Sequence, residues 1–345
     1  MSAAGPLLEI QNLKVIFHDD RGRTTHAVDC VDLTIRRGQT LGLVGESGCG
    51  KSVTALAIMG LLPKGSAEVS GGIRFDGTDL LGLSDREMCD MRGDRLAMIF
   101  QEPMTSLNPV YSIGEQIAET LVRHHGLSRK KARARTIDLL RLVKIPSPEQ
   151  RVDDYPHRLS GGMRQRAMIA LALACDPKLL IADEPTTALD VTIQAQILDL
   201  MRDLKAATGA AIILITHDLG VVAEVCDEVA VMYAGEIVER APVDVLFAAP
   251  QHPYTVGLLG SIPRLDRPKP RRLTAIQGAP PSLIRLPQGC AFAPRCPHRF
   301  ERCSTTPELV DRLGNGHLDR CWLTTEQKVE RREAAIHPEL IEEKA

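Results

Sequence analysis

The chain has 345 residues, of which 44% are hydrophobic and 25% charged, a composition that can form a core and that excludes disorder as its main state. Lys and Arg number 42 against 44 Asp and Glu, which gives a net charge of −2, so no overall positive field attracts nucleic acid or anionic lipid. Aromatic residues make up only 3%, which disfavours a base-stacking surface. At this length we expect two domains, or one large domain with an extension.

Strands dominate the start of the chain, and strands then alternate with helices. We predict strands at 7–17, 31–35, 39–44 and 72–76, a helix at 50–62, a strand at 96–100, helical segments within 113–143, a helix at 162–174, a strand at 178–182, a helix at 191–207 and a strand at 211–215. The later strands are continuous apolar runs, which is typical of a parallel sheet buried on both faces. The fold class is therefore α/β.

The composition changes after about residue 240. Prolines are dense from Pro242 to Pro307, which predicts a loop-rich C-terminal segment, and 324–345 is charged and reads as a helix or tail. The start MSAAGPLLEI lacks the pattern of a secretory signal, and no window holds 18 apolar residues. We expect the chain to stay in the cytoplasm and to owe any membrane role to another chain.

A phosphate-binding loop follows the predicted strand at 39–44. The pattern G-x-x-x-x-G-K-[ST] is formed by Gly45, Glu46, Ser47, Gly48, Cys49, Gly50, Lys51 and Ser52, with Val53 next in the helix that follows. Glycines let backbone N–H groups surround a phosphate, Lys51 reaches the β- and γ-phosphates of ATP, and the Ser52 hydroxyl binds Mg²⁺. The thiol of Cys49 predicts sensitivity to thiol reagents.

Two carboxylates end the apolar strand LLIA. Asp183 is placed to orient Mg²⁺ and Glu184 to take a proton from attacking water. A helix N-cap is the alternative role for Asp183, and Pro185 supports a strand end in either case.

Further motifs complete a recognisable order. After the phosphate-binding loop come Gln101 in MIFQEPMTSLNP, the segment LSGGMRQR from Leu159, the Asp183–Glu184 pair, Asp190 in ALD and His217 in LITHDLG. The sequence resembles the ATPase subunits of ABC transporters. The resemblance implies an ABC-type P-loop ATPase domain, with an N-terminal antiparallel β part, a parallel-sheet core and a helical signature subdomain.

The resemblance also implies a role for each matching residue. Glu184 resembles the catalytic base, His217 the γ-phosphate contact, and Gln101 a residue that senses Mg²⁺ and water. Phe17 matches the aromatic that stacks on adenine, although a core phenylalanine is the alternative. The signature residues that contact ATP held by the opposite subunit are matched by Ser160, Gly161 and Gly162, and Asp190 resembles the residue that couples the two sites. The signature segment is also expected to cap a helix.

The branch of the family is indicated by QHPYTVGLL from Gln251 and GCAFAPRC from Gly289. Both resemble the extension of dipeptide and oligopeptide importer ATPases, which nickel importers partly share. The resemblance divides the chain into an ABC ATPase domain at 7–240, a C-terminal extension at 241–323 and a charged tail at 324–345. For His252 we favour a packing role at a helix start over a ligand role.

Four cysteines fall within 32 residues of this extension: Cys290, Cys296, Cys303 and Cys321. In a proline-rich segment with little apolar sequence, a metal could replace a core. The gaps are wider than usual zinc knuckles and fit an iron–sulfur cluster, zinc or no ligand. Relatives in the resembled branch suggest a structural 4Fe–4S cluster. His298 and His317 lie nearby and are predicted to be surface residues.

The function implied is ATP binding and hydrolysis that energises import of dipeptides or oligopeptides. The implied partners are a second ATPase subunit, two membrane permease chains and a solute-binding protein, with the chain peripheral on the cytoplasmic face of the inner membrane. A nickel importer ATPase is the alternative. An ABC ATPase that acts on DNA or ribosomes and a regulatory ATP-binding protein are less favoured, because no basic patch is evident and Glu184 and His217 are intact.

Overall fold

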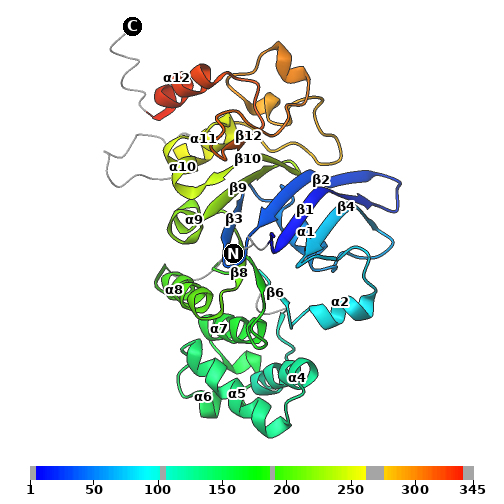
Figure 1. Ribbon diagram of the computed structural model, residues 1–345, viewed down its shortest axis with the longest axis vertical. Coiled ribbons are helices and arrows are strands. Elements are labelled where there is room, and N and C mark those ends of the chain that lie inside the picture. Colours follow the sequence, from blue (N-terminus) through cyan, green and yellow to red (C-terminus); the bar gives the residue numbers. More distant parts are fainter. Residues whose placement is uncertain (1–4, 102–105, 187–190, 262–275, 337–345) are drawn as a thin grey trace.

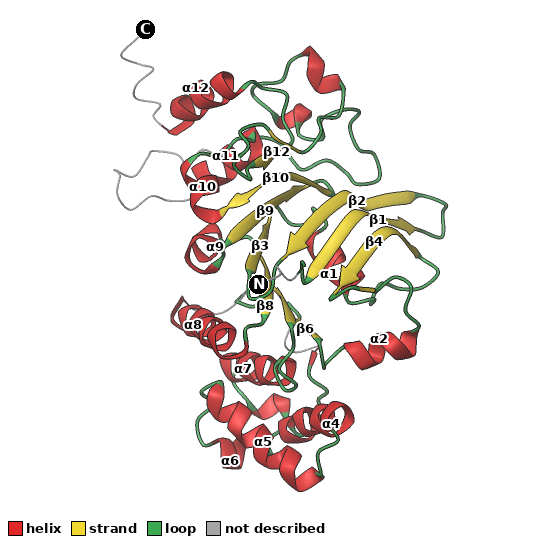
Figure 2. Ribbon diagram, in the orientation of Figure 1, coloured by secondary structure: helices red, strands yellow, loops and turns green. Residues whose placement is uncertain are grey.

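A computed structural model describes residues 5–101, 106–186, 191–261 and 276–336. Figure 1 shows an elongated molecule with a helical group at one end, two sheets in the middle and the C-terminal segment at the other end. Figure 2 separates the strands of the middle from the helices around them. Within the described ranges, no helix is both long enough and apolar enough to cross a membrane.

The first sheet is antiparallel and has the strand order β2-β1-β4-β5. Its strands are β1 (Leu8–His18), β2 (Thr24–Ile35), β4 (Ala67–Phe75) and β5 (Thr78–Asp79). The alternation of buried and exposed residues along β1 is the period-2 pattern of a sheet that covers a core on one face. This sheet is the N-terminal antiparallel part that the family resemblance implied.

The second sheet has eight strands in the order β11-β12-β10-β9-β3-β8-β7-β6. The strands are β3 (Thr40–Val44), β6 (Leu96–Ile99), β7 (Leu179–Asp183), β8 (Ala211–Thr216), β9 (Glu228–Tyr233), β10 (Glu236–Pro242), β11 (Val310–Asp311) and β12 (Leu318–Asp319). Strands β6, β7, β8, β3 and β9 run parallel, whereas β10, β12 and β11 add an antiparallel edge. The predicted parallel core is confirmed, and its antiparallel edge was not foreseen.

The described helices are α1 (Lys51–Ile58), α2 (Asp85–Met91), α4 (Ile113–His125), α5 (Arg129–Leu142), α6 (Pro148–Arg151), α7 (Gly161–Ala172), α8 (Val191–Thr208), α9 (Leu219–Val225), α10 (Val243–Ala248), α11 (Pro253–Gly260) and α12 (Thr325–Ile336). Helices α4 to α6 form the group at the far end of Figure 1. A capping box on Ser112 and Glu115 fixes the start of α4. Helices α10 and α11 lie within the segment for which proline density predicted mainly loops, and the helix start expected at His252 is the start of α11.

Two hydrophobic cores lie on opposite faces of the parallel sheet. Leu179 and Ile181 of β7 point into one core, which also contains buried residues of α1. Leu180 and Ala182 of the same strand point into the other, which contains buried residues of α7. Successive strand residues face opposite sides, so α1 and α7 pack on different faces. The loop before α1 and the signature segment before α7 therefore lead to helices on opposite faces of the sheet.

A buried polar cluster joins the C-terminal segment to the sheet. Glu239 on β10 is fully buried and lies 2.6 Å from Nε2 of His317, which is only 1% exposed. The same carboxylate accepts the backbone N–H groups of Gln251 at 2.6 Å and His252 at 2.9 Å. The prediction that His317 is a surface residue is wrong, because its imidazole is the buried partner of this carboxylate.

An ionic cluster ties the antiparallel sheet to the rest of the molecule. Asp76, in the turn after β4, contacts Arg37, Arg95 and Lys178. Hydrogen bonds, first from Lys178 and next from Arg37, lower the pKa of the Asp76 carboxyl to about 2. The carboxylate therefore stays ionised throughout the physiological range.

Candidate functional site

The phosphate-binding loop leaves the end of β3 and enters α1. Gly45, Gly48 and Gly50 adopt positive φ angles of 153°, 78° and 109°, which glycine allows without strain. A Cβ at Gly45 would lie 2.2 Å from the backbone O of Met232, and one at Gly50 would lie 2.4 Å from the O of Ala27. The tight packing at both ends shapes a loop whose tip, Ser47–Gly48, is exposed. That geometry suits a phosphate at the N-terminus of α1.

Lys51 folds back over this loop. Its side-chain Nζ donates to the backbone O of Gly45 and of Glu46, both at 2.9 Å, and lies 3.6 Å from Cys49 Sγ. The ammonium group is therefore held at the centre of the loop, where phosphate oxygens can replace the two carbonyls as its partners. Cys49 is 5% exposed, and burial raises the pKa of its thiol. Both properties lower its reactivity and run against the sensitivity to thiol reagents expected from sequence.

Ser52 and Asp183 meet across the start of α1 and the end of β7. Ser52 Oγ donates to Asp183 Oδ1 at 3.1 Å. Burial raises the pKa of the Asp183 carboxyl, and the Ser52 hydrogen bond opposes that rise. A hydroxyl and a carboxylate side by side are the hard oxygen donors that Mg²⁺ prefers. The geometry fits the pair of magnesium ligands predicted from sequence.

Glu184 lies at the centre of a polar group at the same edge of the sheet. Gln101 Nε2 donates to Glu184 Oε2 at 3.0 Å, and His217 Nδ1 lies 3.4 Å from Glu184 Oε1. Glu184 adopts a left-handed backbone conformation with φ of 47°, which is strained for a residue with a Cβ and is common at functional sites. Side chains that follow β6, β7 and β8 are thereby brought together at the carboxyl end of the sheet. This is where parallel α/β sheets place their active sites.

The signature segment caps α7. Ser160 Oγ accepts the backbone N–H of Met163 at 3.3 Å, which confirms the helix-cap role. Gly161 is exposed and Gly162 is half-buried, so this helix end is accessible from outside the chain. The predicted coupling residue, Asp190, lies outside the described residues.

The structure also shows the surroundings of Phe17 and His252, two residues for which the sequence left alternative roles. Phe17 lies at the end of β1 opposite Thr25 and Ala67 and is half-buried against the core, so it is accessible for stacking and packed at the same time. His252 caps α11, with its Nδ1 accepting the backbone N–H of Tyr254 at 3.1 Å. The packing role predicted for His252 at a helix start is confirmed.

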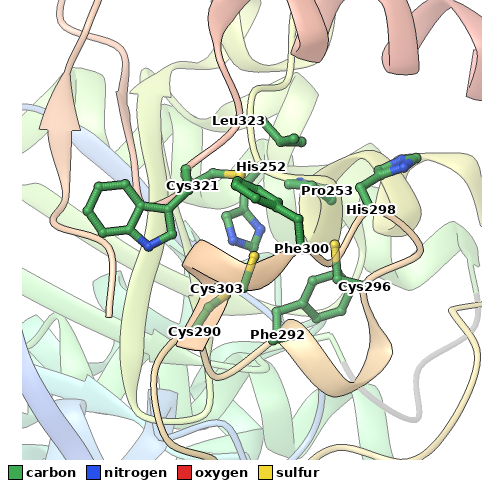
Figure 3. Close-up of a pocket in the computed structure, with 12 residues that line it drawn as sticks. His252, Pro253, Cys290, Phe292, Cys296, His298, Phe300, Cys303, Cys321 and Leu323 are labelled. Carbon is green, nitrogen blue, oxygen red and sulfur yellow. The ribbon is translucent and has the colours of Figure 1, made fainter. Parts of the chain in front are cut away.

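The four C-terminal cysteines line one pocket, shown in Figure 3: Cys290, Cys296, Cys303 and Cys321. Among the described residues, no three His, Cys, Asp or Glu side chains gather closely enough to hold a single ion. Burial raises the pKa of the Cys296 thiol to about 11 and that of Cys321 to about 12. Without a bound cation these thiols stay protonated at neutral pH. The expected metal is therefore not confirmed: the four thiols line one pocket, but they do not lie close enough together to hold a single ion.

Contacts between the C-terminal segment and the phosphate-binding loop were missed at the sequence level. Arg295 Nη1 and Nη2 donate to the two carboxylate oxygens of Glu46 at 2.6 and 3.0 Å. Tyr254 accepts the backbone N–H of Glu46 on its hydroxyl at 2.9 Å. These partners lie more than 200 residues apart, and no local pattern signals such a pairing.

Comparison with known proteins decides the family. Residues 28–187 match the ABC transporter family, and residues 238–303 match the oligopeptide/dipeptide transporter C-terminal region. The oligopeptide transport ATP-binding protein AppD of Bacillus subtilis is 52% identical over 94% of this chain and 98% of its own length. The chain belongs to the ABC transporter ATP-binding proteins. OppD of Salmonella typhimurium, an oligopeptide transport ATP-binding protein, is 50% identical over 94% of this chain and 96% of its own.

The ABC ATPase fold is also found by comparison of structures. The ATP-binding cassette MJ0796, in a dimeric post-hydrolysis state bound to ADP and Pi, superposes with a TM-score of 0.62 at 26% identity. The match covers 68% of this chain and 98% of MJ0796. This ABC protein therefore has the ABC ATPase fold that its motifs predicted, an α/β fold whose second sheet is mixed.

Proposed function

We propose that this chain hydrolyses ATP to energise import of dipeptides or oligopeptides through a membrane complex. ATP hydrolysis is supported mainly by the meeting of Gln101, Glu184 and His217 at the carboxyl edge of the sheet. The glycine-rich loop that leads into α1 lies at the same edge. The chain's relatives are named as oligopeptide and dipeptide transport ATP-binding proteins, which supports the peptide substrate.

The proposed chemistry is positioning and charge neutralisation. The N–H groups of the loop hold the phosphates at the N-terminus of α1, and Lys51 exchanges its two carbonyl contacts for β- and γ-phosphate oxygens. Glu184 accepts the proton of the attacking water, and Gln101 and His217 orient that water against the γ-phosphate. When Mg²⁺ is bound by Ser52, Asp183 and Gln101, it supplies neutralisation of phosphate charge.

A complete site requires two ATPase subunits. The loop lies at the N-terminus of α1, which packs on one face of the sheet, while Ser160 to Gly162 lie at the N-terminus of α7, which packs on the other face. We propose that these signature residues contact ATP bound by a partner subunit, with Asp190 coupling the two sites. The dimeric state of MJ0796 supports this arrangement. Whether the partner is a second copy or a sibling ATPase is an outcome of the test below.

The transport partners are proposed from the family. Two permease chains would receive the motion of the ATPase dimer at the cytoplasmic face of the inner membrane, where this chain would be peripheral, and a solute-binding protein would deliver the peptide. Division of the chain into an ATPase domain at 7–240, an extension at 241–323 and a tail at 324–345 belongs to the same proposal. Nickel import by the same machinery is the alternative, and a non-transport ABC ATPase is less favoured.

The cysteines of the extension are proposed to bind a structural 4Fe–4S cluster, with zinc as the alternative. Four thiols that line one pocket support a common ligand, and cysteine thiolates are the ligands that both groups use. Analysis of iron, sulfide and zinc in protein purified without oxygen tests this. Folded protein that contains none of the three would contradict it.

Uptake by cells tests the function. Cells carrying this chain in place of the native copy are compared with cells carrying Lys51→Ala or Glu184→Gln, using a labelled dipeptide, a labelled pentapeptide and labelled nickel. We expect peptide uptake to fall to background in both variants and nickel uptake to be unchanged. Loss of nickel uptake alone would support the alternative, and loss of neither would refute import of these solutes. Co-purification identifies the partner ATPase.

A further inference from the structure

The phosphate-binding loop is held from outside by the C-terminal segment. Glu46, the second residue of the loop, is the acceptor of a two-pronged ion pair with Arg295. The Arg295 side chain is only 6% exposed, and that of Glu46 is 27% exposed. A guanidinium buried to this degree has a fixed orientation and loses little entropy on pairing. The contact is therefore a stable part of the loop's surroundings.

Arg295 is itself fixed on several sides. Its Nε donates to the backbone O of Gln277 at 3.0 Å, and its Nη1 lies 3.4 Å from the hydroxyl of Tyr233. The guanidinium also lies 5.8 Å from the centre of the Tyr233 ring. Tyr233 ends β9, the neighbour of the strand β3 from which the loop departs. Arg295 thus joins the C-terminal segment both to the loop and to the end of β9.

An aromatic cluster supports the same junction. Tyr233, Tyr254 and Phe292 have ring centres 4.6 to 5.4 Å apart. Tyr254 is fully buried, and its hydroxyl accepts the backbone N–H of Glu46. Tyr254 and Phe292 both belong to the C-terminal segment, so this segment holds Glu46 through its main chain as well as its side chain.

We propose that Arg295 is a positioning residue for ATP binding: through Glu46 it sets the shape of the phosphate-binding loop and neutralises a carboxylate that would otherwise repel ATP. This rests on the proposed nucleotide role of the loop. Glu46 places a negative charge within a loop that receives a polyanion, and the repulsion between like charges in a partly buried site is large. Because the Arg295 guanidinium contacts both oxygens of the Glu46 carboxylate, it offsets this negative charge.

The same contact makes the C-terminal segment responsive to nucleotide. Arg295 ends the short 3₁₀ helix Ala293–Arg295 between Cys290 and Cys296, so a change in the loop is transmitted to the backbone of the cysteine pocket. Coupling between two sites is reciprocal. ATP binding therefore stabilises residues 290–296, and disorder in those residues weakens ATP binding.

A double-mutant cycle on the full chain tests the ion pair. ATP affinity is measured by equilibrium binding for Arg295→Met, Glu46→Gln and the double variant, and ATP hydrolysis gives KM and kcat. We expect Arg295→Met to weaken ATP binding about 10-fold, with a larger effect on KM than on kcat. The double variant is expected to bind within about threefold of Glu46→Gln alone, because the repelling charge is gone. Arg295→Lys keeps the charge but not the two-pronged geometry, so it should recover only part of the affinity.

Arg320→Met is the matched control. The side chain of Arg320, in the same segment, is 12% exposed; it donates to the backbone O of Ile237 and of Pro307 and pairs with Glu236 at 3.5 Å, and none of these partners belongs to the loop. We expect it to lower stability without changing ATP affinity. If Arg295→Met binds ATP like the wild type, or if the two single effects simply multiply in the double variant, the proposal is overturned.

Two further measurements keep the outcome clear. Lys51→Ala should abolish ATP binding, and if it does not, the proposed nucleotide role of the loop is refuted. If Lys51→Ala abolishes ATP binding but Arg295→Met binds ATP like the wild type, only the present inference is refuted. If Arg295→Met does not fold, hydrogen exchange on the wild-type chain replaces it. Added ATP should slow exchange of amides in 290–296 at least several-fold relative to those of α5, and equal exchange with and without ATP would overturn the proposal.

Discussion

Glu239→Ala should loosen the C-terminal segment from the ATPase sheet. The substitution removes the acceptor of two buried backbone N–H groups, those of Gln251 and His252, and the partner of the buried His317 imidazole. Each buried donor left without an acceptor costs about 1–3 kcal/mol. For the two backbone N–H groups together this gives a loss of about 4 kcal/mol in the free energy of unfolding of this segment.

The single tryptophan reports on this loss directly. Trp322 lies in the segment, where its Nε1 donates to the backbone O of Thr305 at 2.9 Å and Arg302 stacks 4.0 Å from its ring centre. Guanidinium titration followed by Trp322 fluorescence should show a lower midpoint in Glu239→Ala, with a smaller shift in Glu239→Gln, which keeps one acceptor oxygen. Glu308→Ala, at an exposed position, is the control. A midpoint in Glu239→Ala equal to that of the control would refute the reasoning.

Three more outcomes are expected. Asp76→Asn should lower the free energy of unfolding by about 2 kcal/mol at pH 7. Because the pKa of Asp76 is about 2 in the folded chain against 3.8 in the unfolded chain, the stability difference between wild type and variant is present above pH 4 and shrinks as pH falls toward 2. Urea titrations followed by circular dichroism that find the same difference at every pH would contradict this. Gly45→Ala should abolish ATP binding while the fold remains by circular dichroism, since the new Cβ would collide with the Met232 carbonyl; normal binding would argue against the tight loop. Brief maleimide treatment should label Cys89, which is exposed, before Cys49, which is buried; mass spectrometry that finds Cys49 labelled first would show the loop to be open.

Local sequence patterns determine the elements that carry the chemistry. Apolar runs such as Ala211–Thr216 fix the buried strands, and glycine spacing fixes the loop between β3 and α1. Catalytic candidates at strand ends, including Glu184 and His217, could be predicted to meet because the carboxyl ends of parallel strands lie along one edge of the sheet. Their meeting in the structure follows from topology that the motif order already implied.

Other features depend on contacts between distant segments. The environment of His317 was predicted wrongly because a lone polar residue carries no periodic signal, and only the packing of β10 and β12 places it next to Glu239. The burial of Cys49 likewise depends on the fold, and it raises the pKa of the thiol and lowers its reactivity.

The family, the glycine-rich loop before α1 and the order of the candidate catalytic residues can be read from the sequence alone, because each depends on spacing along the chain. The tertiary structure decided which face of the sheet each helix covers and that Arg295 reaches across 249 positions to Glu46. The physical reason is that ion pairing and burial depend on distance in space, which local sequence does not encode when the partners come from separate segments.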